Sequence, residues 1–157
     1  MKITLLLTGK TDKGWVQEGI RIYESRLKHY IPFSIVEIPE LKNVSAFTQD
    51  QIKVREGELI LKNIRPSDLV ILLDEHGKEY TSVEWAAFLE NRMTSLGKDM
   101  VFVVGGAYGF SPDVYSRADG KISLSKMTFS HQMVRAIFVE QLYRAFTIMR
   151  GEPYHHE

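Results

Sequence analysis

The chain has 157 residues, a length typical of one domain, since single cores usually span about 100–200 residues. With 44% hydrophobic and 25% charged residues, its composition is that of an ordinary globular protein. It contains no cysteine, which excludes disulfides, thiolate zinc sites, iron–sulfur clusters and a cysteine nucleophile. The first apolar run is too short for a signal peptide or a membrane span, so we expect a cytoplasmic protein.

Charge is uneven along the chain, although the formal net charge is +0. Residues 1–30 carry six basic and three acidic side chains (+3), and residues 121–157 carry five and three (+2). The segment 31–120 carries nine and fourteen (−5). If the fold brings the two basic ends to one face, a neutral protein can present a positive surface to phosphate groups. Uneven charge without a partner is the alternative.

Five short runs of apolar and β-branched residues predict strands, and helical patterns separate most of them. The runs at 69–73 and 100–104 are apolar at every position, which is typical of strands covered by helices on both faces. The alternation predicts a single α/β domain over residues 1–157 with a largely parallel five-stranded sheet flanked by helices. The predicted strands are Lys2–Leu7, Ser34–Ile38, Leu69–Leu73, Met100–Val104 and Lys121–Leu124.

Some helix ends and one loop can also be placed. Thr81 followed by Glu84 has the spacing of a capping box, and Gly97 is placed to end that helix. Ser130 is expected to cap the last helix. The stretch 39–51 is irregular and is predicted to be a mobile surface loop.

The last predicted helix, about residues 132–149, is apolar over an unusually wide surface. One apolar row runs through Phe138 and a second through Leu142, which is more than one sheet face needs. We favour a two-fold homodimer packed through this helix, with deep burial inside one chain as the alternative. On the dimer hypothesis, Phe138→Asp is expected to give an inactive monomer.

Two glycine-containing segments are similar to nucleotide-binding motifs but do not fit them. Gly-Lys-Thr at 9–11 lacks the glycine that a P-loop requires at position 4, where Thr4 stands, so we predict a simple turn. The segment 105–109 departs from the spacing Gly-x-Gly-x-x-Gly, and no acidic residue follows about 20 residues later. These departures argue against a nucleoside triphosphatase and against a nicotinamide-dependent dehydrogenase.

Three predicted strand ends lead into loops suited to a ligand, at 73–78, 104–112 and 124–132. In open parallel sheets, ligands bind in the crevice at the carboxyl ends of the strands. Glycines in the second loop let a ligand approach main-chain N–H groups closely. Consecutive acidic and histidine residues at 74–76 cannot all point inward, so no metal site is expected.

Several segments carry a family resemblance. They are Leu-Asp-Glu-His-Gly-Lys at 73–78, Val-Val-Gly-Gly-Ala-Tyr-Gly at 103–109, Leu-Ser-Lys-Met-Thr-Phe-Ser-His-Gln-Met-Val-Arg at 124–135, Glu-Gln-Leu-Tyr-Arg-Ala-Phe at 140–146 and the Tyr-His ending. Together they resemble the bacterial ribosomal RNA large subunit methyltransferase H family, a minimal branch of the SPOUT methyltransferases. The resemblance extends over the whole chain.

The resemblance implies an enzyme that uses S-adenosylmethionine to methylate N3 of a pseudouridine in 23S rRNA. It also implies a homodimer that acts on the assembled ribosome and a C-terminal trefoil knot, which no periodicity predicts. By motif, the cofactor pocket is expected to contain Leu73, Gly105, Leu124, Ser125, Lys126, Met127, Thr128 and Phe129.

The tail departs from the family pattern, because His156 stands where a permanently charged residue is often found. Histidine is largely neutral at pH 7. We therefore expect RNA contacts from the tail and from other basic residues. These candidates are Lys126, Arg135, Arg144, Arg150, Tyr154, His155 and His156.

For catalysis, N3 must lose its proton before or during attack on the methyl group. His155 is expected to be the general base or a base-orienting group. Tyr154 is expected to stack on the target nucleobase or to hydrogen-bond to it. In the alternative, His155 only positions the RNA and water takes the proton. A non-catalytic RNA-binding module remains the rival to an enzyme, with the glycine loop contacting phosphate instead of a cofactor.

Overall fold

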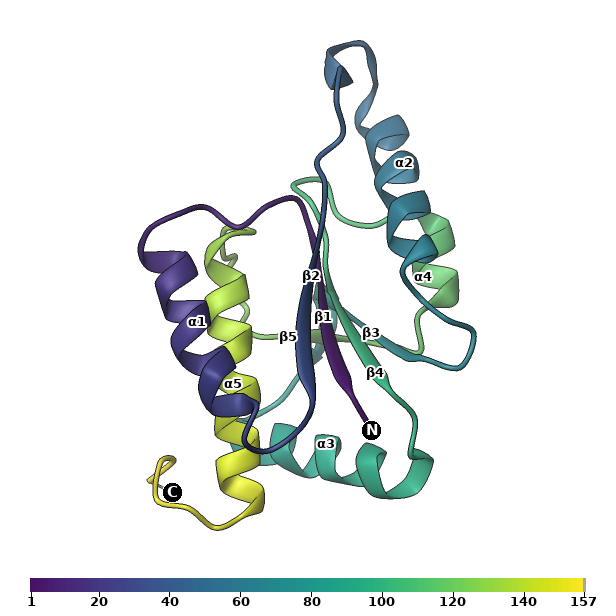
Figure 1. Ribbon diagram of the computed structural model, residues 1–157. Helices are drawn as coiled ribbons and strands as arrows, with labels where there is room; N and C mark the ends of the chain where they lie inside the picture. The colour runs from purple at the N-terminus through teal and green to yellow at the C-terminus, as the bar shows by residue number, and fades with distance from the viewer. Residues whose placement is uncertain (157) are drawn as a thin grey trace.

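The computed structural model describes residues 1–156, which form one sheet between two layers of helices (Figure 1). The strands are β1 (Ile3–Thr8), β2 (Phe33–Ile38), β3 (Leu69–Glu79), β4 (Met100–Val104) and β5 (Gly120–Ser123). The helices are α1 (Trp15–Leu27), α2 (Gln49–Lys62), α3 (Ser82–Leu96), α4 (Pro112–Arg117) and α5 (Met133–Met149), with a short 3₁₀ turn at Val44–Ala46.

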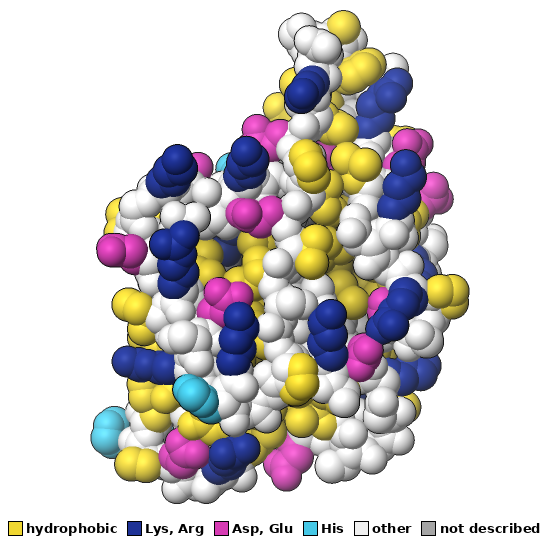
Figure 2. All heavy atoms as spheres, viewed as in Figure 1, with side chains coloured by type: hydrophobic (Ala, Val, Ile, Leu, Met, Phe, Trp, Pro, Cys, Tyr) yellow, Lys and Arg dark blue, Asp and Glu magenta, His cyan; other side chains and the backbone are white. Residues whose placement is uncertain are grey.

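The five strands are all parallel, in the order β2-β1-β4-β3-β5, which confirms the predicted fold class. Helices α1, α3 and α5 cover one face of the sheet, and α2 and α4 cover the other (Figure 1). Because α1 packs beside α5, the two basic ends of the chain lie next to each other. Lys and Arg side chains project over the α1 part of the surface, with acidic side chains among them (Figure 2). The trefoil knot stays a prediction of the resemblance.

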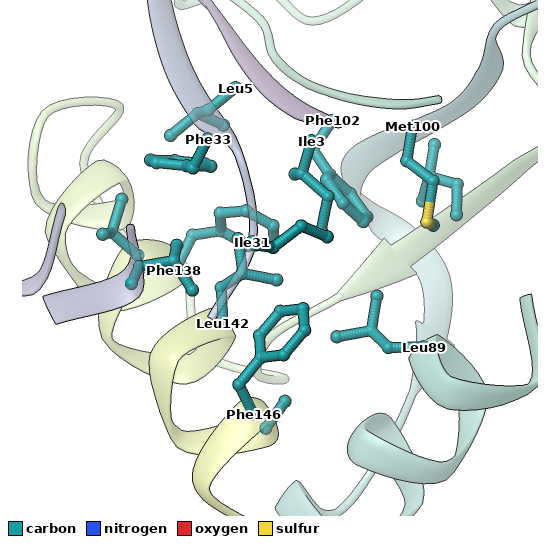
Figure 3. Packing of buried hydrophobic residues seen from close by; sticks show 14 of the residues in the cluster. Ile3, Leu5, Ile31, Phe33, Leu89, Met100, Phe102, Phe138, Leu142 and Phe146 are labelled. Carbon is teal, nitrogen blue, oxygen red and sulfur yellow. The ribbon is translucent and has the colours of Figure 1, made fainter. Parts of the chain in front are cut away.

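The larger core lies under α5, which sends Phe138, Leu142 and Phe146 toward Ile31 and Phe102 (Figure 3). These three side chains are therefore used inside one chain, whereas Met133 at the start of the helix is 43% exposed. Within residues 1–156, no helix is long and apolar enough to cross a membrane.

This packing corrects the expectation that Phe138→Asp gives an inactive monomer. Phe138 is 0% exposed and its ring lies 5.0 Å from that of Phe102. A carboxylate at this depth has no partner to offset its desolvation, so the change would unfold the domain instead of separating two protomers.

The predicted ends of α3 are confirmed, whereas the predicted cap of α5 is displaced. Thr81 and Glu84 form a complete capping box, and Gly97 ends α3 with a φ of 60°. Ser130 does not occupy the N-cap position of α5, which is Gln132, but its Oγ accepts a hydrogen bond from the Met133 N–H at 3.0 Å in the turn before the helix. Ser111 caps α4, where Pro112 is the first residue.

Two predicted boundaries were wrong. Helix α2 begins at Gln49, inside the predicted loop 39–51, because a capping box between Thr48 and Gln51 starts it earlier than the apolar pattern indicates. Strand β3 continues to Glu79, beyond its apolar half, and its pairing with β5 shifts register between Leu73 and Lys78. Polar residues in that second half hid the strand from an analysis based on apolar runs.

The structure contradicts the expectation that Arg135 contacts RNA. Its side chain is 0% exposed, and its guanidinium donates to the carbonyl oxygens of Thr8, Gly9 and His131 at 2.8–3.0 Å and to the Thr11 hydroxyl at 3.0 Å. Burial lowers the pKa of Arg135, with the carboxylate of Glu37 acting in the opposite direction. Arg135 therefore joins the turn after β1 to the start of α5 and presents no donor to RNA.

We predict that Arg135→Met destabilises the protein by about 3 kcal/mol, because buried carbonyl groups lose a charged donor. The matched control is Arg150→Met at an exposed position, which is expected to change stability by less than about 0.5 kcal/mol. Urea unfolding measures both values. Equal effects of the two substitutions would contradict the structural role of Arg135.

Candidate active site

A cavity of about 610 Å³ lies at the carboxyl ends of β4 and β5 and beside residues 73–76 in the middle of β3. These three strands are neighbours in the sheet, so the loops after β4 and β5 meet this part of β3 at one edge. The volume lies within the range of about 300–1,000 Å³ that is typical of small-molecule sites. The three junctions expected from the sequence therefore surround one hollow.

The structure brings together all the expected cofactor residues except Lys126. The cavity is lined by Leu73, Gly105, Leu124, Ser125, Met127, Thr128 and Phe129, together with other residues. Lys126 is exposed and is not among the lining residues.

Hydrogen bonds within the loop after β5 fix its shape. Ser123 Oγ donates to the Ser125 carbonyl oxygen at 2.9 Å, and Ser125 Oγ accepts from the Met127 N–H at 2.9 Å. The Ser125 hydroxyl thus serves the loop's own backbone, as serine does in turns. Met127, which is 78% exposed, stands at the rim of the cavity.

The glycine loop after β4 needs its small residues for packing. A Cβ on Gly105 would lie 3.0 Å from the Phe110 ring, and one on Gly106 would lie 2.7 Å from Glu56 Oε2. Burial, and secondarily repulsion from Glu40, raises the pKa of Glu56. The loop lies between the Phe110 ring and the half-buried carboxyl group of Glu56, and its residues line the cavity.

Two lining residues were not expected from the sequence. They are Lys53 from α2 and Tyr115 from α4, whereas Tyr108 and His131 lie in loops already expected to hold a ligand. The Tyr115 hydroxyl donates to Asp74, and burial followed by this hydrogen bond raises its pKa to about 12. Lys53 and Tyr115 had no sequence signal, because only the tertiary fold brings α2 and α4 to this edge.

The C-terminal tail, residues 150–156, lies away from the cavity. No residue of 150–156 lines the cavity, and the described tail packs at the far end of α5 (Figure 1). Arg144, which contacts the tail, lies about 15 Å along the helix axis from Val134 at the cavity, at 1.5 Å per residue. Within one chain, the expected catalytic residues and the expected cofactor residues are therefore separated.

A polar cluster centred on Glu140 holds the tail. Glu140 Oε1 accepts from the Tyr154 hydroxyl at 2.9 Å and from Arg144 Nη2 at 2.6 Å. Arg144 Nη1 lies 3.0 Å from His155 Nδ1. Burial, with hydrogen bonds to Tyr23 and Glu140, raises the pKa of Tyr154, which keeps its hydroxyl protonated. Glu140 was missed as a site residue, although its i,i+4 spacing to Arg144 is visible in the sequence.

The remaining basic candidates differ in exposure. Arg150 is exposed, with its guanidinium 4.5 Å from the Tyr30 ring centre, and His156 is exposed as well. Tyr30 donates to Glu152 at 2.6 Å, and this hydrogen bond, followed by burial, raises its pKa to about 12. Across residues 1–156, no three His, Cys, Asp or Glu side chains are grouped to hold a metal ion.

A parallel sheet with a loop-lined cavity at its carboxyl edge defines an α/β protein of the kind that binds nucleotide-like ligands. Residues 1–155 match the family described as "Predicted SPOUT methyltransferase". The chain therefore belongs to the SPOUT methyltransferase family, and the resemblance found in its motifs is confirmed.

Relatives of known name match this chain over its full length or nearly so. A protein of Parabacteroides distasonis is 57% identical over 157 residues, covering 100% of both chains, and one of Phocaeicola vulgatus is 55% identical with the same coverage. A protein of Christiangramia forsetii is 54% identical over 156 residues, covering 99% of each. All three are named ribosomal RNA large subunit methyltransferase H.

We predict that Gly77→Ala destabilises the protein by about 1–3 kcal/mol, the usual cost of overpacking. A Cβ there would lie 2.5 Å from the Ile122 carbonyl carbon, so β5 and the loop after it must move. Gly120→Ala is the control, because a Cβ at that position meets nothing within 4 Å. Thermal unfolding measures both variants, and a Gly77→Ala variant as stable as wild type would contradict the close approach of β3 and β5.

Proposed function

We propose that the protein transfers a methyl group from S-adenosylmethionine to N3 of a pseudouridine in large-subunit ribosomal RNA. The observation that carries this proposal is the convergence of three family motifs on one cavity at the sheet edge. Membership of a methyltransferase family and the names of relatives with 54–57% identity support the reaction and the RNA class. The resemblance supplies the nucleotide and its atom, and action on ribosomes would place the protein in the cytoplasm.

The residues of the cavity fit a nucleoside carrying an amino acid. The apolar side chains of Leu73, Leu124 and Phe129 can contact an adenine ring, while main-chain groups of the loops can bond to its edge. Gly105 and Gly106 line the cavity, so their main chain can contact such a group. When bound, S-adenosylmethionine supplies an electrophilic methyl group on a sulfonium centre.

The protein's chief task in this reaction is orientation. N3 loses its proton to water or to a base, forms a bond to the methyl carbon, and the electron pair of the carbon–sulfur bond stays on sulfur. Holding the reacting atoms in line while excluding water is worth about 7–11 kcal/mol. The loops at 104–112 and 124–132 are stiffened by their own packing and hydrogen bonds, which suits that task.

The separation between tail and cavity supports a homodimer with shared sites. Tyr154 and His155 are held by α5 at a distance from the cavity of their own chain. A two-fold partner can bring its tail to that cavity and complete the site. This arrangement also supplies surface for RNA that a chain of this size lacks after enclosing a cofactor.

The function is tested with labelled methyl donor and, separately, ribosomes, subunits, free rRNA and tRNA. We expect label in large-subunit rRNA of the ribosome, mapping to N3 of one pseudouridine. In parallel, S-adenosylmethionine at 100 times its dissociation constant should stabilise the protein by about 2.7 kcal/mol. RNA binding without methyl transfer and without stabilisation by the donor would favour the non-catalytic RNA-binding module.

Shared sites are tested by mixing two inactive variants. Thr128→Trp fills the cavity from an exposed position, and His155→Ala removes the tail imidazole. A purified heterodimer of the two has one intact site only if tails cross between protomers, so we expect about half of the wild-type rate. An inactive heterodimer would contradict shared sites.

The control is a heterodimer of wild type with the double variant Thr128→Trp/His155→Ala. If tails cross, both of its sites carry one defect, and we expect it to be inactive. If each tail serves its own chain, this heterodimer keeps about half of the rate instead. The two heterodimers therefore give opposite results under the two arrangements.

A further inference from the structure

We propose that Glu140 and Arg144 hold His155 as a hydrogen-bond donor through Nε2, so that its imidazole stabilises an oxygen of the target base instead of removing the N3 proton. The part of this proposal that concerns the target base rests on the proposed function. The part that concerns the imidazole rests on the tail cluster alone.

The contact between Arg144 and His155 decides the position of the imidazole hydrogen. Arg144 Nη1 lies 3.0 Å from His155 Nδ1, a normal hydrogen-bond distance. A guanidinium has only donors and stays charged at all ordinary pH values, so Nδ1 must offer its lone pair. A neutral imidazole carries one N–H, and that hydrogen then lies on Nε2.

Glu140 fixes the guanidinium that imposes this tautomer. Its Oε1 accepts from Arg144 Nε at 3.1 Å and from Nη2 at 2.6 Å, which leaves Nη1 directed to the histidine. The side chains of Arg144 and Glu140 are 25% and 19% exposed, so water competes only partly for these bonds. The Tyr154 ring lies 4.7 Å from the guanidinium carbon and limits its movement on another side. Glu140 and Arg144 are thus positioning residues that act through His155.

The chemistry of the target favours a donor at this place. When an imide nitrogen loses its proton, negative charge spreads to the two adjacent carbonyl oxygens. A fixed N–H aimed at one of these oxygens stabilises that charge, and removing one such donor typically lowers kcat by about 10²–10³-fold. The proton of N3 passes to water, because the lone pair of Nδ1 is engaged by Arg144 and Nε2 already carries hydrogen.

Nitrogen NMR tests the tautomer without any activity measurement. In protein labelled with ¹⁵N-histidine, the signals of His155 are identified by their absence from the His155→Gln variant. We expect a pyridine-like Nδ1 and a protonated Nε2. Arg144→Met should convert this pattern to a mixture of tautomers, whereas Arg150→Met, the matched change at an exposed arginine, should leave it intact. A protonated Nδ1 in the wild type would overturn the proposal.

Substitution of His155 tests the role in catalysis. The amide nitrogen of glutamine can replace Nε2–H as a donor but cannot take a proton, whereas the shorter asparagine places its amide near Nδ1. At saturating ribosomes, we expect His155→Ala and His155→Asn to lower kcat by about 10²–10³-fold. His155→Gln should retain kcat within about tenfold of wild type, and thermal unfolding checks that all variants fold.

A general base predicts a different result. If His155 removed the N3 proton, His155→Gln would be as slow as His155→Ala, and this outcome would overturn the donor role. If the wild type methylates no ribosomal RNA, the proposed function fails, while the nitrogen spectra still decide whether Arg144 fixes His155 as an Nε2–H donor.

Discussion

The order of the parallel strands is the constraint on which the site depends. Because β4, β3 and β5 are neighbours and run in the same direction, the loops after β4 and β5 meet residues 73–76 of β3 at one edge and share a space with them. The strands are held there by burial on both faces, with Leu72, Phe102 and Val103 fully covered. Hydrophobic burial thus places loops that are far apart in the sequence around one cavity.

Two buried or half-buried arginines show how polar contacts refine this arrangement. Arg135 joins the turn after β1 to the start of α5, and Arg144 joins the middle of α5 to the tail. Both were expected to contact RNA, because basic residues near the end of such a chain are natural phosphate ligands. In the structure, Arg135 donates only within the chain, and Arg144 is committed to Glu140 and His155.

Much of the fold was predictable from local pattern. Apolar runs predicted the five strands, and capping signals at Thr81 and Gly97 predicted helix ends, because both depend on residues close in sequence. The second half of β3 and the early start of α2 were not predicted, since polar strands and cap-driven starts carry no apolar period.

For the site, motifs predicted the cavity residues but not the position of the tail. Where Tyr154 and His155 lie depends on contacts with Glu140 and Tyr23, which come from two helices separated by most of the chain. The burial of Phe138 was likewise invisible in sequence, because an apolar stripe looks the same whether a partner chain or the protein's own core covers it. Packing between distant segments decides such questions.

The most direct test of the account is a crystal structure of the protein with S-adenosylmethionine. We expect the nucleoside between the loops that follow Leu73, Val104 and Ser123, with its methyl group directed toward the tail of a second protomer. A donor molecule bound outside this cavity, or a cavity left empty at saturating donor, would contradict the central claim that these three strand ends form the cofactor site.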